Sequence, residues 1–228
     1  MKQVWHDLLF MHWPMRAEQL RPLIPPELEI ESYEGSAWVG VVPFRMSGIR
    51  AHGMPPVPGT SAFPELNVRT YVRTGGKPGV WFFSLDAANS FAVAAARHFF
   101  HLPYFRARMR TKRGPHGEIQ YDSHRTHNGA PSADFRGSYR ASNDSVFQAK
   151  PGSREYFFVE RYCLYAATRG DVFCGEIDHP PWQLQRAEAK IEVDTMAAAS
   201  GITLPASKPL LHFVRRQEVR VWLLTPTS

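Results

Sequence analysis

The sequence predicts a mainly β protein of the α+β class, built on a mostly antiparallel barrel or curved double sheet with a few short helices. Segments rich in β-branched and aromatic residues recur along the whole chain, and Gly, Pro, Asn and Asp separate them. Stretches typical of helices are few. The 228 residues, 43% of them hydrophobic, can form a large core, so we expect residues 1–228 to be a single domain.

Strands are expected wherever alternating or continuous apolar runs end at turn residues. Clear turns are Tyr33-Glu34-Gly35-Ser36, Gly75-Gly76-Lys77-Pro78 and Gly114-Pro115-His116-Gly117. The expected strands are residues 4–10, 28–33, 37–45, 65–73, 79–85, 105–112, 118–124, 134–141, 161–167, 172–177, 187–193 and 211–224.

Helices are expected at two places. Residues 16–23 could form two turns, which Pro25-Pro26 must end. Residues 89–100 form the better helix, because the alanines favour it and Asp86, Asn89 or Ser90 can cap it. Short turns are possible at Ser153 and over residues 194–201, and the Pro-rich residues 54–59 predict a rigid loop over a surface or pocket.

No segment has the ~20 consecutive apolar residues that cross a bilayer. The first 13 residues are broken by His6, Asp7 and His12, so they do not have the pattern of a secretory signal. We therefore expect a cytoplasmic protein without a membrane partner.

The two cysteines, Cys163 and Cys174, flank an expected hairpin turn at Arg169-Gly170. In that register Cys163 faces Glu176 and Cys174 faces Tyr165, which makes the thiols diagonal neighbours and not an opposed pair. We expect no disulfide from this arrangement.

The charge balance is positive, with 27 basic and 21 acidic residues. The densest basic cluster alternates with apolar residues along one strand and consists of Arg106, Arg108, Arg110, Lys112 and Arg113. A solvated strand face explains this pattern most simply, and anion binding is the alternative. No nucleic-acid-binding motif accompanies it, so we expect no nucleic-acid partner.

The expected strand 65–73 has polar residues at alternate positions. Glu65, Asn67 and Arg69 share one face, whereas Leu66 and Val68 share the other. One interpretation is a half-exposed strand with a weak surface pair between Glu65 and Arg69. The other is that the polar face lines a barrel lumen, where a carboxylate and a guanidinium orient a small polar or anionic ligand.

Cofactor motifs are not found. His98 and His101 are three residues apart on the expected helix, and His124 and His127 lie beside a loop, but such pairs are common and no HExxH pattern occurs. The GxSxG, Walker and GxGxxG patterns are also missing. We therefore expect no metal and no cofactor.

Several motifs together resemble those of one superfamily. They are residues 10–14 (FMHWP), 20–25 (LRPLIP), 63–69 (FPELNVR), 79–82 (GVWF), 85–87 (LDA), 96–97 (AR), 102–104 (LPY), 161–162 (RY) and 179–182 (HPPW). With them, nearly the whole chain resembles the uncharacterised YqjF-like family of the acetoacetate decarboxylase-like superfamily. The resemblance implies a closed, mostly antiparallel barrel with a buried central pocket and a tendency to form homo-oligomers.

The resemblance also has one departure. In acetoacetate decarboxylase a Pro-Lys-Lys segment supplies the lysine that forms a Schiff base with the keto acid. Matched without gaps, Arg97 and Pro103 take the family's arginine and proline, but Tyr104 and Phe105 stand where the two lysines would be. Neither residue has a primary amine, so acetoacetate decarboxylation is not expected. Glu65 looks like a match for a pocket glutamate.

Five further residues each have two interpretations, one as part of the pocket and one as part of the structure around it. Tyr104 is a hydrogen-bond donor or, with a lowered pKa, a general acid, or else a packed tyrosine. Arg97 binds a carboxylate, or braces Glu65 or a carbonyl at the helix end. His12 reaches the pocket or is a buried structural histidine. His179 orders its loop or reaches the pocket, and Trp81 belongs to the core or the pocket wall.

Two functional hypotheses follow. In the first, a barrel pocket binds a small organic molecule, such as an anionic carbonyl compound, and any catalysis is acid–base or electrostatic and not covalent. In the second, the same scaffold is a non-catalytic binding or sensory protein.

Overall fold

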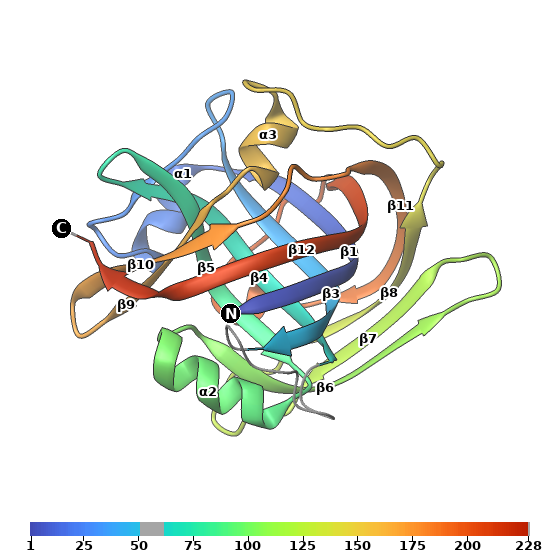
Figure 1. Ribbon diagram of the computed structural model, residues 1–228, viewed down its shortest axis with the longest axis horizontal. Coiled ribbons are helices and arrows are strands. Elements are labelled where there is room, and N and C mark those ends of the chain that lie inside the picture. The colour runs from blue at the N-terminus through green and yellow to red at the C-terminus, as the bar shows by residue number, and fades with distance from the viewer. Residues whose placement is uncertain (51–61, 228) are drawn as a thin grey trace.

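The computed structural model describes residues 1–50 and 62–227, and nearly all regular structure in it is β (Figure 1). Twelve strands form one sheet. They are β1 (Lys2–Met15), β2 (Glu29–Ile30), β3 (Ala37–Arg50), β4 (Phe63–Thr74), β5 (Lys77–Ala87), β6 (Tyr104–Arg113), β7 (Ile119–Arg125), β8 (Asp134–Ala141), β9 (Cys163–Thr168), β10 (Asp171–Asp178), β11 (Gln185–Asp194) and β12 (Leu210–Pro226). Every expected strand overlaps one of these, so the mainly β prediction is confirmed.

The sheet closes on itself. Strands β12, β1, β3, β4, β5, β9 and β10 pair in that order, and β10 pairs again with β12. We call this closed set the ring. Its pairs are antiparallel except for the short parallel pair between β5 and β9. Strands β6, β7, β8 and β11 run outside it, from β5 to β12, and cover the other face of the shared strands.

Two cores follow from the alternation of side chains along the shared strands. The ring core lies inside the ring and includes Phe10, Phe44, Phe82 and Val214. The outer core lies between the shared strands and β7 and β8, and Tyr121 is one of its members. Because both faces of β4 are covered, that strand is buried along most of its length.

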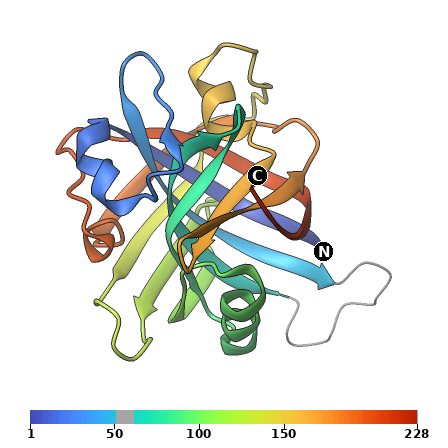
Figure 2. The same ribbon diagram turned by 90° about the vertical axis from the view of Figure 1, so that its left-hand side faces the viewer.

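Short helices close the ends of the ring. Helix α2 (Ser90–Phe100) and helix α3 (Arg154–Val159) lie on opposite sides of the strands in both ribbon views (Figures 1 and 2). Asn89 caps α2 by accepting from the backbone N–H groups of Phe91 and Ala92 at 3.0 Å each. Near residues 16–23 the chain forms α1 (Ala17–Leu20) and the 3₁₀ turn Arg21–Leu23, and a second 3₁₀ turn is Ala198–Ser200.

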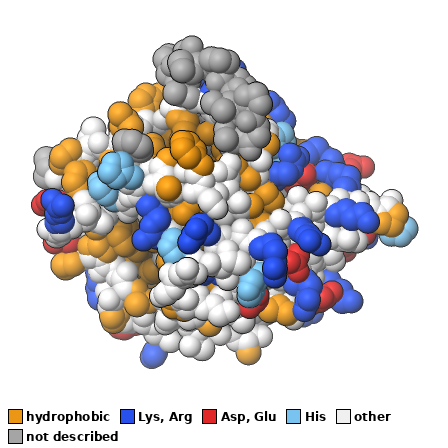
Figure 3. Space-filling model, turned by 90° about the horizontal axis from the view of Figure 1, so that it is seen from below, with side chains coloured by type: hydrophobic (Ala, Val, Ile, Leu, Met, Phe, Trp, Pro, Cys, Tyr) orange, Lys and Arg blue, Asp and Glu red, His pale blue; other side chains and the backbone are white. Residues whose placement is uncertain are grey.

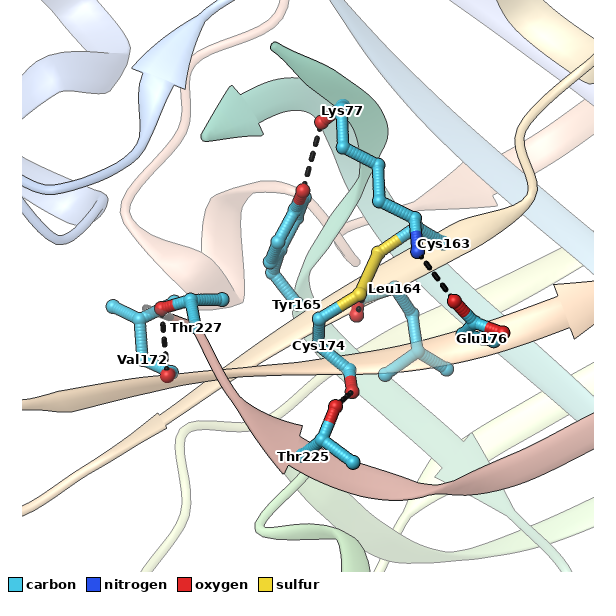
Figure 4. The surroundings of a disulfide bond; sticks show 9 residues. All are labelled: Lys77, Cys163, Leu164, Tyr165, Val172, Cys174, Glu176, Thr225 and Thr227. Carbon is cyan, nitrogen blue, oxygen red and sulfur yellow. Dashed lines mark hydrogen bonds and ion pairs between the residues drawn. A yellow bond between two sulfur atoms is a disulfide. The ribbon is translucent and has the colours of Figure 1, made fainter. Parts of the chain in front are cut away.

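The expectation for the cysteines is wrong. The predicted register is present, with Cys174 opposite Tyr165 and Cys163 opposite Glu176, yet the structure contains a Cys163–Cys174 disulfide (Figure 4). Twist of a two-stranded hairpin shortens one of its diagonals, and the two Cα atoms are 6.4 Å apart, within the range that a disulfide spans. The sequence argument treated the hairpin as flat.

Two further expectations concern segments rather than strands. The Pro-rich loop at residues 54–59 lies outside the described residues. In the part of the chain that is described, no helix has the length and apolar character needed to span a bilayer.

Candidate functional site

The polar face of β4 points into the ring. Glu65, Asn67, Arg69 and Tyr71 alternate along the strand and are all buried. On β3, Phe44 lies opposite Glu65, Val42 opposite Asn67 and Gly40 opposite Arg69. The register between β3 and β4 ends before Tyr71. The structure thus places this row inside the ring and not on a half-exposed surface.

Glu65 is hydrogen-bonded to Tyr104 at the end of the ring near α2. The Tyr104 hydroxyl donates to Glu65 Oε2 at 2.7 Å. Burial raises the pKa of Glu65 to about 8, the nearby Asp86 charge adds to the increase, and the hydrogen bond from Tyr104 opposes it. Burial, followed by the Glu65 carboxyl, raises the pKa of Tyr104 well above its usual range, so the lowered pKa that a general acid would need is not found and Tyr104 is a hydrogen-bond donor. At neutral pH both groups therefore hold their protons.

Arg69 is a buried cation that forms no ion pair with any described carboxylate. Arg69 is 7% exposed, and its Nε atom has no hydrogen-bond partner. The guanidinium carbon lies 5.2 Å from the Phe10 ring centre and 5.8 Å from that of Tyr71. Two aromatic faces therefore surround the charge, but no described anion neutralises it.

His12 lies beside Arg69, next to α3. Its Nε2 is 2.5 Å from the Tyr71 hydroxyl, and its ring stacks on Phe158 of α3 with 3.9 Å between the ring centres. Burial lowers the pKa of His12 well below its usual value, and the charges of Arg69 and His212 lower it further. His12 is therefore neutral, which is consistent with its position beside a guanidinium.

Gly40 makes room for both of these side chains. A Cβ atom at this position would lie 3.2 Å from two atoms of the His12 ring and 3.5 Å from Cγ of Arg69. A larger residue on β3 would therefore push His12 or Arg69 from its place. This close approach is the local reason why the sequence has glycine between Val39 and Val41 in the buried part of β3.

Three polar atoms of the site, two in this row and one on β1, are each buried without a hydrogen-bond partner. They are Asn67 Oδ1, Arg69 Nε and His12 Nδ1. Buried polar groups are rarely left unpaired, because the cost of removing them from water is not recovered. Clefts of about 160 and 500 Å³ on the described part of the chain are lined by other residues.

Arg97, His179 and Trp81 are not brought into this group. Arg97 is exposed, and its guanidinium donates to the backbone carbonyl of Tyr104 at 2.7 Å, so it braces the start of β6. His179 lies 3.2 Å from the carbonyl of Arg161 through Nε2 and orders its own loop. Trp81 pairs with Thr70 and packs against the outer core, on the opposite face of the sheet from Arg69.

Sequence reasoning did not select three residues that shape the site. The alternating pattern of the strand puts Tyr71 on the same face as Glu65, Asn67 and Arg69, but only those three polar neighbours were selected as site residues. Asp86 and Arg125 form a buried ion pair behind Tyr104, with Arg125 Nη2 and Nε at 2.6 and 2.8 Å from the two carboxylate oxygens. These residues are 39 apart in sequence, and no local pattern connects them.

The lysines all lie away from the ring core. The sequence has six, which are Lys2, Lys77, Lys112, Lys150, Lys190 and Lys208. Each is exposed or half-buried, and Lys2 and Lys77 form surface ion pairs with Glu218 and Glu176. Among the described residues, no group of three or more His, Cys, Asp or Glu side chains is arranged to hold a metal ion.

The closed ring with an outer layer of strands defines a protein of the acetoacetate decarboxylase-like fold. Similar solved structures include an acetoacetate decarboxylase-like enzyme from Sphingomonas wittichii RW1, with a TM-score of 0.66, 11% identity, and coverage of 100% of this chain and 92% of that one. The acetoacetate decarboxylase of Legionella pneumophila has a TM-score of 0.61 and 11% identity, covering 99% and 87%. The enduracididine biosynthesis enzyme MppR complexed with pyruvate has a TM-score of 0.65 and 12% identity, covering 100% and 90%.

The family is shown by sequence. Residues 2–218 match the model of the DUF2071 family, described as an uncharacterised conserved protein. The protein YqjF of Bacillus subtilis (strain 168) is 46% identical over 228 residues, which cover 100% of this chain and 93% of that protein. This chain belongs to the DUF2071 family, and the resemblance found in the motifs is confirmed.

Proposed function

We propose that the ring binds a small organic anion, with Arg69 as the counter-ion of its carboxylate and the Glu65–Tyr104 pair as the acid–base group. The observation that carries this proposal is the burial of Arg69 without a described carboxylate partner. A buried, uncompensated charge costs several kcal/mol. Contacts with two aromatic rings return only about 1–2 kcal/mol each. A bound carboxylate would neutralise the guanidinium with two parallel hydrogen bonds.

Glu65 suits a role as proton donor. With a pKa of about 8 it is mainly protonated at neutral pH, and it can lose that proton within the physiological range. Glu65 and Arg69 are four residues apart on one strand face, a Cα separation of roughly 13 Å for an extended chain. A carbonyl compound with its carboxylate at Arg69 would direct the other end of the molecule towards Glu65.

Chemistry in this ring would proceed without an imine. An imine needs a primary amine, and every lysine side chain lies at an exposed or half-buried position away from the ring core. Tyr104 occupies the place that the family resemblance assigns to lysine, and its phenol donates to Glu65 at 2.7 Å. The residues therefore favour proton transfer or electrostatic polarisation of a carbonyl. The complex of MppR with pyruvate identifies a suitable first probe.

Calorimetric titration with pyruvate and acetoacetate tests the assignment of Arg69. We expect binding by the wild-type protein and loss of binding in Arg69→Met, which keeps the volume and removes the charge. Arg73→Met is the matched control, since Arg73 lies on the same strand, is exposed and pairs with Glu29. Equal binding by wild type and Arg69→Met would refute the proposed counter-ion.

Borohydride trapping tests the absence of an imine. We expect no covalent adduct when the wild-type protein is incubated with pyruvate and borohydride and then examined by mass spectrometry. Tyr104→Lys is the positive control, because it puts an amine beside Glu65; circular dichroism would verify its folding. An adduct on any wild-type lysine would contradict the proposal.

A non-catalytic binding protein is the second candidate. The positions of two described clefts favour it. Neither the cleft lined by Asp7 nor the cleft lined by α2 includes Glu65 or Arg69, so a ligand bound in either cleft would not contact the acid–base pair. Product analysis by NMR after binding distinguishes the two. Turnover that is lost in Glu65→Gln and Tyr104→Phe supports an enzyme, whereas tight binding of an unchanged ligand supports a sensor or carrier.

A further inference from the structure

A second concave region lies outside the ring, between α2 and the first residues of β6. This groove has a volume of about 500 Å³. Its charged and imidazole lining consists of Arg97 and His98 from α2, Arg106 from β6 and His127 from the loop after β7. Ser90, Val93 and Ala94 of α2 complete the helix side. Neither Glu65 nor Arg69 contributes to it, so it is distinct from the site proposed above.

The groove is cationic. Arg97 and Arg106 are both exposed, and none of its described lining residues is acidic. The negative charge of Asp86 raises the pKa of His127, but Asp86 is already paired with Arg125. Burial lowers the pKa of His127, and the charges of Arg97, Arg106 and Arg125 lower it further, which indicates a positive potential at this position.

His127 adds a hydrogen-bond donor. Its Nδ1 accepts the backbone N–H of Arg106 at 3.2 Å. A neutral imidazole that accepts at Nδ1 has its proton on Nε2, so the ring can donate through that nitrogen. The groove thus combines two guanidinium groups with an imidazole N–H.

On the neighbouring strands of this layer, arginines form ion pairs with carboxylates. Arg136 of β8 pairs with Glu192, and Arg140 pairs with Glu188. In contrast, the outward row of β6 is exposed and forms no ion pair with a described carboxylate; it consists of Arg106, Arg108, Arg110 and Lys112. Lys and Arg side chains are visible over the face that contains α2 and β6 (Figure 3). At Arg106 this row enters the groove.

We infer that the groove between α2 and β6 binds the phosphate group of a small phosphorylated molecule. Guanidinium groups bind phosphate oxygens with paired hydrogen bonds, and the imidazole N–H adds a third donor. The volume exceeds that of a phosphate group alone, so it accommodates part of the molecule that carries the phosphate. Farther along the row, Lys112 lines a different cleft, of about 160 Å³, to which the carboxylate Asp7 also belongs. The groove at Arg106 is therefore separate from that cleft, and this favours a small ligand over a polymer.

Arg97 connects this groove to the ring. The same guanidinium that lines the groove donates to the carbonyl of Tyr104, whose hydroxyl donates to Glu65. A phosphate that draws Arg97 towards itself would weaken its bond to that carbonyl. Occupation of the groove would in this way reach the Glu65–Tyr104 pair through a single residue.

Titration with inorganic phosphate and with adenosine monophosphate, followed by ³¹P NMR and calorimetry, tests the inference. We expect Arg106→Gln to weaken binding by about tenfold or more, the effect of losing a charge-assisted hydrogen bond. Arg110→Gln is the matched control, because Arg110 lies on the same exposed face of β6 outside the groove, and we expect less than about a twofold change. Equal effects of the two variants, or no binding, would overturn the inference.

Two additional arms separate related explanations. If inorganic phosphate binds as tightly as the monophosphate, the ligand is free phosphate and the inferred phosphorylated molecule is wrong. If a single-stranded oligonucleotide binds and loses affinity equally with Arg106→Gln and Arg110→Gln, the surface is a polyanion site and the inference also fails. Phosphate binding by Arg69→Met should be unchanged, so this result is independent of the function proposed for the ring.

Discussion

Arg69 and Arg125, two of the buried arginines, lie on opposite faces of the same sheet, and their surroundings differ. Arg125 reaches Asp86 with two hydrogen bonds at 2.6 and 2.8 Å, and its guanidinium carbon lies 4.1 Å from the centre of the Phe105 ring. Arg69 also lies against aromatic rings, but no described carboxylate pairs with it. Only Arg125 therefore has a counter-ion within the described chain.

This difference indicates different roles. A buried ion pair whose members satisfy each other is part of the structure, and breaking it leaves one buried charge unpaired. A buried charge that already has no partner makes the folded state less stable unless a ligand supplies the counter-ion. Burial alone therefore does not show whether an arginine is structural or functional. The presence or absence of a carboxylate partner within the chain distinguishes the two roles.

The largest effect is expected when the paired arginine loses its partner. Asp86→Ala leaves Arg125 buried and uncompensated, and should lower the free energy of unfolding by about 3–5 kcal/mol. Urea denaturation followed by tryptophan fluorescence measures this change. Asp122→Ala is the control, because this carboxylate is at an exposed position of β7 and its loss should cost less than about 0.5 kcal/mol. Similar losses in both variants would contradict a structural role for the pair.

A second prediction concerns the buried carboxyl group of Glu65, on the same strand as Arg69. The pKa of Glu65 is raised from 4.5 to about 8, so the folded state keeps a proton that the unfolded chain releases in this window. The free energy of unfolding should therefore fall as the pH rises from about 4.5 to 8, by on the order of 3 kcal/mol from this group. Glu65→Gln should remove this fall.

Urea titrations at pH 5 and pH 8 provide the measurement for Glu65. The difference between the two pH values should be larger in the wild type than in Glu65→Gln. Glu118→Gln is the control: this half-exposed carboxyl lies on the turn before β7, its pKa is lowered by hydrogen bonds from backbone N–H groups, and the variant should therefore behave as the wild type does between pH 5 and pH 8. If wild type and Glu65→Gln showed the same pH dependence, the carboxyl would not be a neutral acid in the folded protein.

The third prediction removes the unpaired charge. Arg69→Met should leave stability unchanged or raise it by about 1–2 kcal/mol, because an apolar side chain of similar length fits the ring core without a desolvation cost. The effect is therefore opposite in sign to that of Asp86→Ala. A loss of more than about 2 kcal/mol by urea denaturation would show that Arg69 is a structural residue like Arg125.

The strands were predicted well from the sequence because apolar and polar residues alternate between the two faces of a strand, so each residue indicates which face it belongs to. Alternation in residues 65–73 identified Glu65, Asn67 and Arg69 as one face, and the structure puts that face inside the ring. The closure of the ring was implied by the family resemblance and not by any strand pattern, since it depends on a second pairing of β10 with β12, whose residues are far apart in sequence. The disulfide was missed because hairpin twist is not visible in a flat register.

Within the site, residues on one strand were easier to predict than residues that meet across strands. Glu65 and Tyr104 were both identified, but separately, and their 2.7 Å hydrogen bond depends on the parallel pairing of β5 and β6. Trp81 was placed in the core or the pocket wall, but a register shift between Val68 and Arg69 puts it on the opposite face from Arg69. Irregular pairing of this kind has no signature in composition.

The smallest effect is expected for a third arginine, Arg97, which the family resemblance had matched to the site. Its guanidinium is exposed and donates to one backbone carbonyl, so water can replace it, and Arg97→Met should cost less than about 1 kcal/mol. Arg110→Met, equally exposed and outside the groove, is the matched control for the loss of a surface charge. In calorimetry with pyruvate, Arg97→Met should weaken binding far less than Arg69→Met does. If Arg97→Met abolished pyruvate binding and Arg69→Met did not, the exposed arginine would be the counter-ion, and the distinction between Arg69 and Arg125 would have no functional meaning.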